Sequence, residues 1–296
     1  MYKGQERMAS QTIGVIGAGL MGHGIAYLLA AAGHTVRIYD PSAEWRNSLS
    51  QRLKSALDLL DGDPALLGRI SAHDQLAPAM KDVSFVFEAA PEKLPLKQQL
   101  FAELEALTSP TTILASNSSA IPSTRIGEKL KHRDRVVGTH FWNPPHLVPL
   151  VEVTQNEKTS DETVRKTMEL LRDAGRAPVH VKKDIPGFVG NRLQHALKRE
   201  AIALVAAGVC DADTIDEVVK NGFGARMAVL GPMEQTDLVG TDLTLDIQNV
   251  LLADLRHARC SRAARHRRRA ELIIPGRASS SPERGPTAVP SRVRPS

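Results

Sequence analysis

The chain has 296 residues and a hydrophobic content of 42%, enough to fill the core of one large domain or of two moderate ones. Its net charge of +5 is concentrated at one end, because residues 254–296 contain eleven Arg and three acidic residues, a net +8, which leaves −3 for the rest. This distribution excludes a nucleic-acid surface on the body, and no apolar run approaches the roughly 20 residues of a membrane span. Cys210 and Cys260 match no disulfide or metal spacing, so we expect a cytoplasmic protein with no bound metal.

Short β-branched runs alternate with longer helical patterns through the first part of the chain. In order, the sequence predicts strand 12–19, helix 20–32, strand 35–40, helix 44–67, strand 83–90, helix 96–107, strands 111–117, 135–141 and 150–156, helix 161–174 and strand 177–183. Strands that are apolar throughout are typical of a sheet covered by helices on both faces. The pattern predicts an α/β fold with a Rossmann-type, doubly wound and mostly parallel sheet.

The pattern changes at residues 184–187, Asp-Ile-Pro-Gly, because proline breaks the preceding strand and only helical patterns follow, at 187–207, 213–220 and 236–252. Beyond residue 253 the composition is rich in Arg, Ser and Pro and poor in large apolar groups, which predicts disorder. We therefore expect a Rossmann domain at 1–183, a smaller and incomplete all-helical domain at 184–253, and a basic, disordered tail at 254–296.

A G-x-G-x-x-G pattern lies between the first predicted strand and helix, and it spans Gly17, Gly19, Leu20, Met21 and Gly22. In this context the glycines allow a tight turn, close approach of the backbone to a pyrophosphate and close helix packing. The start of the helix favours the negative charge of the phosphates. The alternative is a glycine-rich turn without a ligand, and the motif alone also fits FAD.

Asp40 ends the second predicted strand, 23 residues after Gly17. A carboxylate at this spacing accepts hydrogen bonds from the adenosine ribose hydroxyls and would repel a 2′-phosphate. The sequence therefore predicts NAD rather than NADP as the cofactor, although Arg37 and Arg46 lie nearby.

Four segments resemble the 3-hydroxyacyl-CoA dehydrogenase family within residues 12–250, namely GVIGAGLMGHGIA, ASNSSAIPST, GTHFWNPPHLVPLVEV and DIPGFVGNRL. The resemblance implies a homodimer that catalyses the reversible NAD-dependent oxidation of an L-3-hydroxyacyl-CoA. LGPMEQTDLVG resembles the short-chain hydroxybutyryl-CoA enzymes, which favours an acyl-CoA thioester substrate. Related branches carry the same motifs and act on free 3-hydroxy acids such as L-gulonate or carnitine, so both substrate classes stay open.

The same resemblance assigns His140 as general base, Glu152 as its partner, and Ser119 and Asn191 as holders of the substrate oxygens. A histidine with a pKa near neutral can take the hydroxyl proton, while a glutamate orients the ring and stabilises the imidazolium. Serine and asparagine can both donate to a developing alkoxide. The contacts on the nicotinamide side are assigned to Asn117, Asn143, Glu92 and Lys97. The alternatives are a hydrogen-bonded histidine at a strand end, turn or helix-end polar groups, and a solvated lysine.

The resemblance ends near residues 252–255, where the Arg-, Ser- and Pro-rich tail replaces further helices. We interpret the tail as an out-of-frame reading of the gene, which resequencing of its last segment tests, and the stretch before Met8 as an upstream extension. A tail that binds nucleic acid or a membrane surface is one alternative. Another is a catalytically inactive protein, which would bind nucleotide without turnover.

Overall fold

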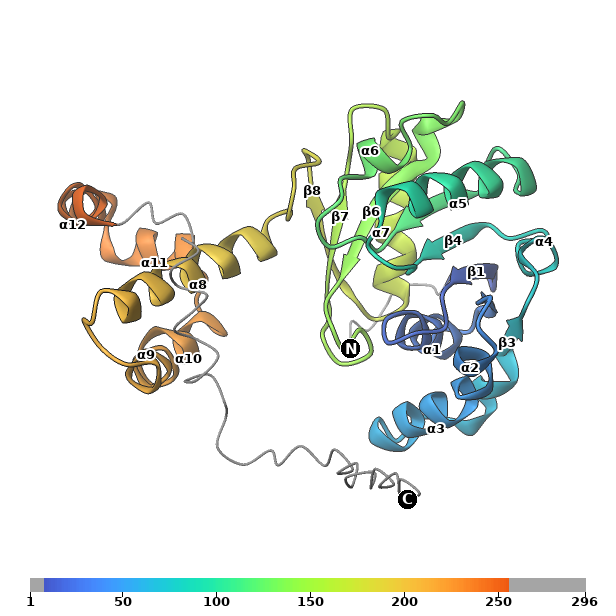
Figure 1. The fold of residues 1–296 in the computed structure, drawn as a ribbon, viewed down its shortest axis with the longest axis horizontal. Helices are drawn as coiled ribbons and strands as arrows, with labels where there is room; N and C mark the ends of the chain where they lie inside the picture. The colour runs from blue at the N-terminus through green and yellow to red at the C-terminus, as the bar shows by residue number, and fades with distance from the viewer. Residues whose placement is uncertain (1–7, 256–296) are drawn as a thin grey trace, which may run out of the picture. The chain divides into compact units, whose positions relative to one another are not determined.

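The computed structural model describes residues 8–255, which form two compact units that divide between His195 and Ala196. The first unit contains an 8-stranded sheet with the strand order β3-β2-β1-β4-β5-β6-β7-β8 (Figure 1). Its strands are β1 (Thr12–Ile16), β2 (Thr35–Tyr39), β3 (Ile70–His73), β4 (Phe85–Glu88), β5 (Ile113–Ser116), β6 (Val136–Phe141), β7 (Leu150–Thr154) and β8 (Ala177–Val181). The predicted Rossmann-type sheet is confirmed.

The strand pairs of this sheet are parallel with one exception, because β7 runs antiparallel to β6. An antiparallel pair places residues of the two strands directly opposite each other. The carboxyl ends of β1, β2, β4 and β5 share one edge of the sheet, where ligands of open α/β sheets bind.

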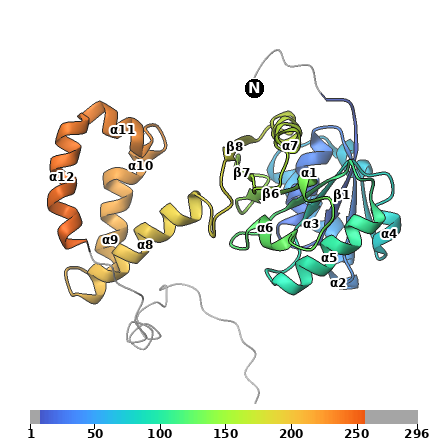
Figure 2. The same ribbon diagram turned by 90° about the horizontal axis from the view of Figure 1, so that it is seen from above.

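Helices cover both faces of the sheet because alternate strand residues point to opposite sides. On one face Val15 and Phe87 belong to a core that includes residues of α1 and α7, whereas Val86 and Leu114 belong to a second core with residues of α5 and α6 (Figure 2). The helices of this unit are α1 (Gly22–Ala31), α2 (Ala43–Asn47), α3 (Leu49–Leu59), α4 (Leu76–Ala79), α5 (Leu94–Leu107), α6 (Ser123–Ile126) and α7 (Asp161–Asp173).

Two helix predictions are wrong in detail. The helix predicted at 44–67 is divided into α2, α3 and a 3-10 segment (Pro64–Arg69). The 3-10 segment is separate because Asp63 caps a new start that has Pro64 in its first turn. The helix predicted at 236–252 is two helices, separated by Gly240 with a φ of +102°. Strand β3 and the short helices α4 and α6 were absent from the prediction, since four-residue elements give almost no periodicity.

The second unit is helical, as predicted. Its elements are the later part of α8 (Gly190–Ala206), α9 (Ala212–Val219), a π-helical turn (Lys220–Gly224), α10 (Ala225–Met227), α11 (Pro232–Val239) and α12 (Thr241–Asp254). Among the described side chains of this unit only Ala203 is buried, while Val229 is 88% and Leu238 75% exposed. No helix within residues 8–255 is long and apolar enough to cross a bilayer. The predicted tail at 254–296 lies almost wholly outside the described residues.

Three histidines, the buried His23 and His34 and the partly buried His146, should make the folded protein sensitive to mild acid. Burial lowers the pKa of each below its usual value, and His34 also accepts the Gln11 amide hydrogen on Nδ1 at 3.2 Å. In the unfolded chain the three imidazoles take up a proton near pH 6.5, whereas in the folded chain they do so only at lower pH. The free energy of unfolding is therefore highest above about pH 6.5 and falls as the pH drops below that value. Urea midpoints should therefore decrease between about pH 7.5 and about pH 5.5. A flat profile would contradict this expectation, and His34→Asn should reduce the slope.

Candidate active site

The loop between β1 and α1 contains two glycines that have no room for a side chain. Gly17 has a φ of +93°, and a Cβ there would lie 2.9 Å from the carbonyl oxygen of Ala89. A Cβ at Gly22 would collide with the carbonyl oxygen of Gly17. At Gly19, in contrast, a Cβ would meet nothing within 4 Å. The loop is tight at both ends and open in the middle, as the approach of a ligand to its backbone requires.

This loop also presents unpaired backbone donors. Of the described residues, none accepts a hydrogen bond from the amides of residues 19–22, which include Leu20 and Met21. These amides precede or begin α1, and the N-terminal end of a helix carries a partial positive charge. Free amides at such a place bind phosphate oxygens. The loop therefore fits the pyrophosphate of a dinucleotide.

Asp40 lies beyond the carboxyl end of β2 and is bound to the same loop. Its Oδ2 accepts the Ala18 amide hydrogen at 2.7 Å, which leaves lone pairs for ribose hydroxyls. Arg37 and Arg46, the two cations near it in the sequence, donate to main-chain carbonyl oxygens at 2.6 and 2.7 Å. The arrangement fits an adenosine ribose beside the Asp40 carboxylate. It favours NAD over NADP, because the 2′-phosphate of NADP would be repelled by that carboxylate.

Arg52 of α3 is part of this region although the sequence did not single it out. Its guanidinium donates to the carbonyl oxygens of Ala18 and, at 3.3 Å, of Gly19. The guanidinium carbon lies 5.0 Å from the centre of the Trp45 ring, within the range of a cation–π contact. Arg52 occupies a polar position on an amphipathic helix, and from the sequence alone such an arginine cannot be distinguished from one that is simply solvated.

Lys97 and Glu92 meet around a buried carboxylate that the sequence also did not single out. Glu88, at the end of β4, is fully buried, and its Oε1 lies 2.6 Å from Lys97 Nζ. Its Oε2 accepts a hydrogen bond from Ser116 Oγ at 2.7 Å. Lys97 Nζ lies 3.5 Å from Glu92 Oε2, so the lysine joins both carboxylates. Lys97 is therefore a buried cation and not a solvated one.

Glu92 in turn holds the loop that follows β5. Its Oε1 accepts hydrogen bonds from Ser118 Oγ at 2.5 Å and from the amide of Ser119 at 3.1 Å. Burial would raise the pKa of Glu92, but the hydrogen bonds from Ser118 and the loop amides and the charge of Lys97 lower it further than burial raises it. Glu92 is thus ionised at neutral pH and anchors the segment that carries Ser119.

Lys97→Met should destabilise the fold strongly, because it leaves the Glu88 charge buried without its partner. We expect a loss of about 3–5 kcal/mol in the free energy of unfolding, measured in urea. Adding Glu88→Gln should restore much of that loss. The control is Lys166→Met, which removes an exposed ion pair to Glu162 and should cost less than about 1 kcal/mol. Equal effects of the two lysine substitutions would contradict the buried pair.

His140 on β6 and Glu152 on β7 are direct partners in the antiparallel ladder. His140 Nδ1 lies 2.8 Å from Glu152 Oε2, and both side chains are buried. The other carboxylate oxygen accepts the amide hydrogens of Val189 and Gly190, each at 2.9 Å. Burial would raise the pKa of Glu152, but these hydrogen bonds lower it more, so the net pKa is below its usual value. An ionised Glu152 can only accept, which places the imidazole proton on Nδ1 and leaves Nε2 as a base.

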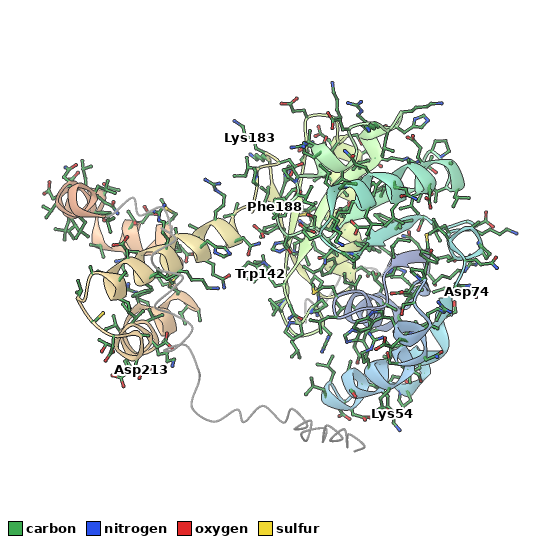
Figure 3. All side chains as sticks on the ribbon, in the orientation of Figure 1. Lys54, Asp74, Trp142, Lys183, Phe188 and Asp213 are labelled. Atoms are coloured by element: carbon green, nitrogen blue, oxygen red, sulfur yellow. The ribbon has the colours of Figure 1, made fainter. Side chains whose placement is uncertain are left out.

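Aromatic side chains surround this histidine. The rings of Trp142 and Phe188, both labelled in Figure 3, lie 5.6 and 5.4 Å from the His140 ring. Asn117 is buried, and its Oδ1 accepts the amide hydrogen of Phe141 at 2.9 Å, so it fixes the end of β6. Two aromatic rings thus pack beside the imidazole, and Asn117 fixes the end of the strand that carries it.

Ser119 and Asn191 also meet. Asn191 Nδ2 donates to the carbonyl oxygen of Ser119 at 3.1 Å, and the Ser119 side chain is exposed. The Ser119–Asn191 pair is connected along the chain to the His140–Glu152 pair, because Gly190, whose amide donates to Glu152, directly precedes Asn191. Asn143 is exposed, and its side chain makes no hydrogen bond with another described residue. Within residues 8–255 no group of three His, Cys, Asp or Glu side chains is arranged to hold a metal ion.

Two family models match the chain. The NAD binding domain of 3-hydroxyacyl-CoA dehydrogenase matches residues 12–185, and the C-terminal domain of the same enzyme matches residues 187–281. The chain belongs to the 3-hydroxyacyl-CoA dehydrogenase family. This dehydrogenase accordingly uses NAD, for which the loop at Gly17–Gly22 and Asp40 provide the fit. The second match extends past residues 252–255, where the motif resemblance ends, into a part of the chain outside the described residues.

Relatives of this dehydrogenase differ in substrate. It is 38% identical to a 5-formyl-3-hydroxy-2-methylpyridine 4-carboxylate 5-dehydrogenase of Mesorhizobium japonicum over 83% of this chain and 81% of the relative. It is 38% identical to a probable 3-hydroxybutyryl-CoA dehydrogenase of Bacillus subtilis over 86% and 90%. It is 37% identical to an L-carnitine dehydrogenase of Streptomyces coelicolor over 77% and 73%.

Among solved structures, that of the pyridine carboxylate dehydrogenase, described as an NAD+ dependent dismutase, has a TM-score of 0.79. It is 36% identical and covers 84% of this chain and 82% of its own. All of these proteins are named as dehydrogenases, and the one with the solved structure is described as NAD+ dependent.

Proposed function

We propose that this dehydrogenase catalyses the reversible oxidation of a short-chain L-3-hydroxyacyl-CoA, of the 3-hydroxybutyryl-CoA type, to the 3-ketoacyl-CoA. The observation that carries the proposal is the buried pair of His140 and Glu152, in which a carboxylate with both oxygens occupied holds an imidazole with Nε2 free to act as a base. The thioester is supported by the similarity to the probable 3-hydroxybutyryl-CoA dehydrogenase, of which the match covers 90%.

Each polar residue has a defined task in this proposal. NAD+ supplies the acceptor for the hydride that leaves C3 of the substrate. In the oxidation of the substrate, His140 Nε2 takes the hydroxyl proton, and in the reverse reaction it returns that proton. Glu152 keeps the proton on Nδ1 and stabilises the imidazolium that forms. Ser119 Oγ and Asn191 Nδ2 donate hydrogen bonds to the substrate oxygens, where negative charge develops.

The residues that would hold the dinucleotide divide into two groups. The pyrophosphate and the adenosine ribose are assigned to the loop at Gly17, Gly19, Leu20, Met21 and Gly22 and to Asp40. The nicotinamide side is assigned to Asn117, Asn143, Glu92 and Lys97. Lys97 would act there as a fixed positive charge, because Glu88 and Glu92 hold its ammonium group in place.

The test follows NADH absorbance with purified protein and either acetoacetyl-CoA or free acetoacetate. NADH consumption with the thioester alone, in an assay with excess substrate, supports the proposal. NADH consumption with free acetoacetate alone would contradict the proposal of a thioester substrate, while the assignment as an oxidoreductase would stand. If neither is turned over although NADH binds, the choice of a 3-keto substrate is wrong or the protein is inactive.

A free hydroxy acid is the second candidate substrate. It is favoured by the similarity to the L-carnitine dehydrogenase and by the TM-score of 0.79 with an enzyme whose named substrate is a free pyridine carboxylate. The same histidine and glutamate would serve, since any carbinol must lose a proton together with its hydride. L-Carnitine, L-gulonate and an aromatic aldehyde with a neighbouring carboxylate, each offered with NAD+, would separate this class from the thioester.

We also propose that residues 184–253 form the substrate and dimerisation domain, after a cofactor domain at 1–183. The exposed apolar side chains of α11 and α12, such as Leu238 and Val250, support a subunit contact, because a monomer rarely leaves so many uncovered. Light scattering should give the mass of a dimer. A monomer at micromolar concentration would contradict the proposal.

A further inference from the structure

The linker at residues 184–191, between β8 and the first turn of α8, is bound to the sheet domain at its beginning. Asp184 Oδ2 accepts three hydrogen bonds from the start of α6, from Ser123 Oγ at 2.9 Å, the Thr124 amide at 2.8 Å and Thr124 Oγ1 at 3.0 Å. Ser123 Oγ also accepts a hydrogen bond from Asn156 Nδ2 at 2.9 Å. The other oxygen, Asp184 Oδ1, is buried and has no partner among the described residues. One oxygen of the Asp184 carboxylate thus accepts all three of these hydrogen bonds at the beginning of the linker.

Three residues further on, the linker makes a left-handed turn. Gly187 has a φ of +75° and Phe188 a φ of +47°. For a residue with a bulky side chain this conformation costs about 1–2 kcal/mol, so surrounding contacts must hold it. Phe188 is 1% exposed, its ring lies 5.4 Å from the His140 ring, and its amide donates to the Ile185 carbonyl oxygen at 3.1 Å.

The turn directs the next two amides to one acceptor. Val189 and Gly190 both donate to Glu152 Oε1 at 2.9 Å, and no other described group donates to that oxygen. Without them Glu152 would keep His140 as its sole hydrogen-bond partner, and a carboxylate bound at one oxygen can rotate. The orientation of the proposed base therefore depends on the backbone of the linker.

We propose that Asp184 and Phe188 are positioning residues, which hold the linker in the conformation that fixes Glu152 and, through it, His140. The inference rests on the proposed function for the roles of His140 and Glu152, and it adds that the linker is part of the active-site support. Asp184 acts at a distance, by fixing where the turn begins. Phe188 acts by packing against the imidazole while its backbone aims the two amides.

Asp184→Ala removes the acceptor of three hydrogen bonds and should release the linker. We expect kcat to fall on the order of tenfold with KM little changed, since a shift of a catalytic group by a fraction of an ångström has effects of this size. Asp184→Asn should restore the rate, because its amide oxygen can accept the same three hydrogen bonds. Thr124→Val, which removes one donor, is the milder variant if Asp184→Ala does not fold.

A second readout needs no substrate. Hydrogen exchange of the Val189 and Gly190 amides, followed by NMR, should be slow in the wild type and in Asp184→Asn and at least about tenfold faster in Asp184→Ala. The matched control is Asp173→Ala. Asp173 also binds a distant amide, that of Met8 at 3.3 Å, and also has one buried oxygen without a hydrogen-bond partner, but it neither belongs to the linker nor makes a hydrogen bond with it.

The two readouts separate the linker inference from the proposed function. Unchanged exchange in Asp184→Ala would overturn the attachment by Asp184, whatever the substrate. Faster exchange with an unchanged kcat would overturn the positioning role. If kcat falls by the same factor in Asp173→Ala, the effects of Asp184→Ala on kcat and on exchange reflect general destabilisation, and the positioning role is also overturned. If the wild type turns over neither substrate class, the proposed function fails while the exchange result still stands.

Discussion

His140→Gln should lower kcat in both directions by about 10²–10⁴, the usual contribution of a general base. Glutamine can still donate a hydrogen bond to Glu152 Oε2, so the buried carboxylate keeps a partner and the fold should persist. The substitution removes only the titratable nitrogen that would take the hydroxyl proton. Steady-state NADH absorbance gives kcat, and NADH fluorescence gives the dissociation constant of the cofactor, which should stay within about threefold of the wild type.

Glu152→Gln provides the companion measurement. Its side chain has the same shape, but its amide group can present a hydrogen to His140 Nδ1 in place of a lone pair, which would move the imidazole proton to Nε2. The wrong tautomer should lower kcat by a factor comparable to that of His140→Gln. Because the two residues act as a unit, the double variant should be no slower than the worse single one. Additive losses, or a His140→Gln enzyme with normal kcat, would show that another group is the base.

Gly22→Ala should abolish tight NADH binding, because the added methyl group collides with the carbonyl oxygen of Gly17 and the loop must open. Overpacking of this kind costs about 1–3 kcal/mol, or roughly tenfold to hundredfold in affinity if the strain is relieved by distorting the binding loop. The melting temperature should fall as well, since the collision occurs without any ligand.

Gly19→Ala separates the cofactor from the fold. A Cβ at Gly19 meets nothing within 4 Å, so the melting temperature should not change. In the proposed site the dinucleotide would approach the backbone through this open space, and NADH affinity should then fall by about tenfold or more. Gly68→Ala, at another glycine whose Cβ meets nothing within 4 Å, should change neither quantity. Undiminished NADH affinity in Gly19→Ala would place the cofactor elsewhere.

The sheet and the glycine loop could be predicted because their signals are local. Buried parallel strands appear as short apolar runs, and the G-x-G-x-x-G pattern between a strand and a helix specifies one kind of turn. His140 and Glu152 were found through the family resemblance, and the ladder then places them directly opposite each other. No sequence period predicts that pairing, since it depends on β7 reversing the direction of its neighbour.

The residues that were missed depend on contacts between distant segments. Glu88 lies in an apolar strand, where a carboxylate is expensive to bury, and only the fold brings Lys97 and Ser116 to it. The sequence places Asp184 at the domain boundary and Phe188 in the helix predicted at 187–207, and it gives no sign of their roles because their partners lie more than 40 residues earlier in the chain. Asp63 and Pro64 are a local signal for a new helical start inside the helix predicted at 44–67. The amphipathic pattern that continues across them favours a single helix instead.

The antiparallel step between β6 and β7 has a consequence for how such enzymes diversify. The histidine and the glutamate are held by the hydrogen-bonded ladder itself, in register at His140 and Glu152, and not by the connection between the strands. That connection begins with Trp142, whose ring lies 5.6 Å from the His140 ring, and with the proposed cofactor contact Asn143, so variation in length and composition is expected mainly at residues 144–149 while the His140–Glu152 pair stays in place. One histidine–glutamate pair held in this way would suit several alcohol substrates, and the relatives are named for a 3-hydroxybutyryl-CoA, for carnitine and for a pyridine carboxylate.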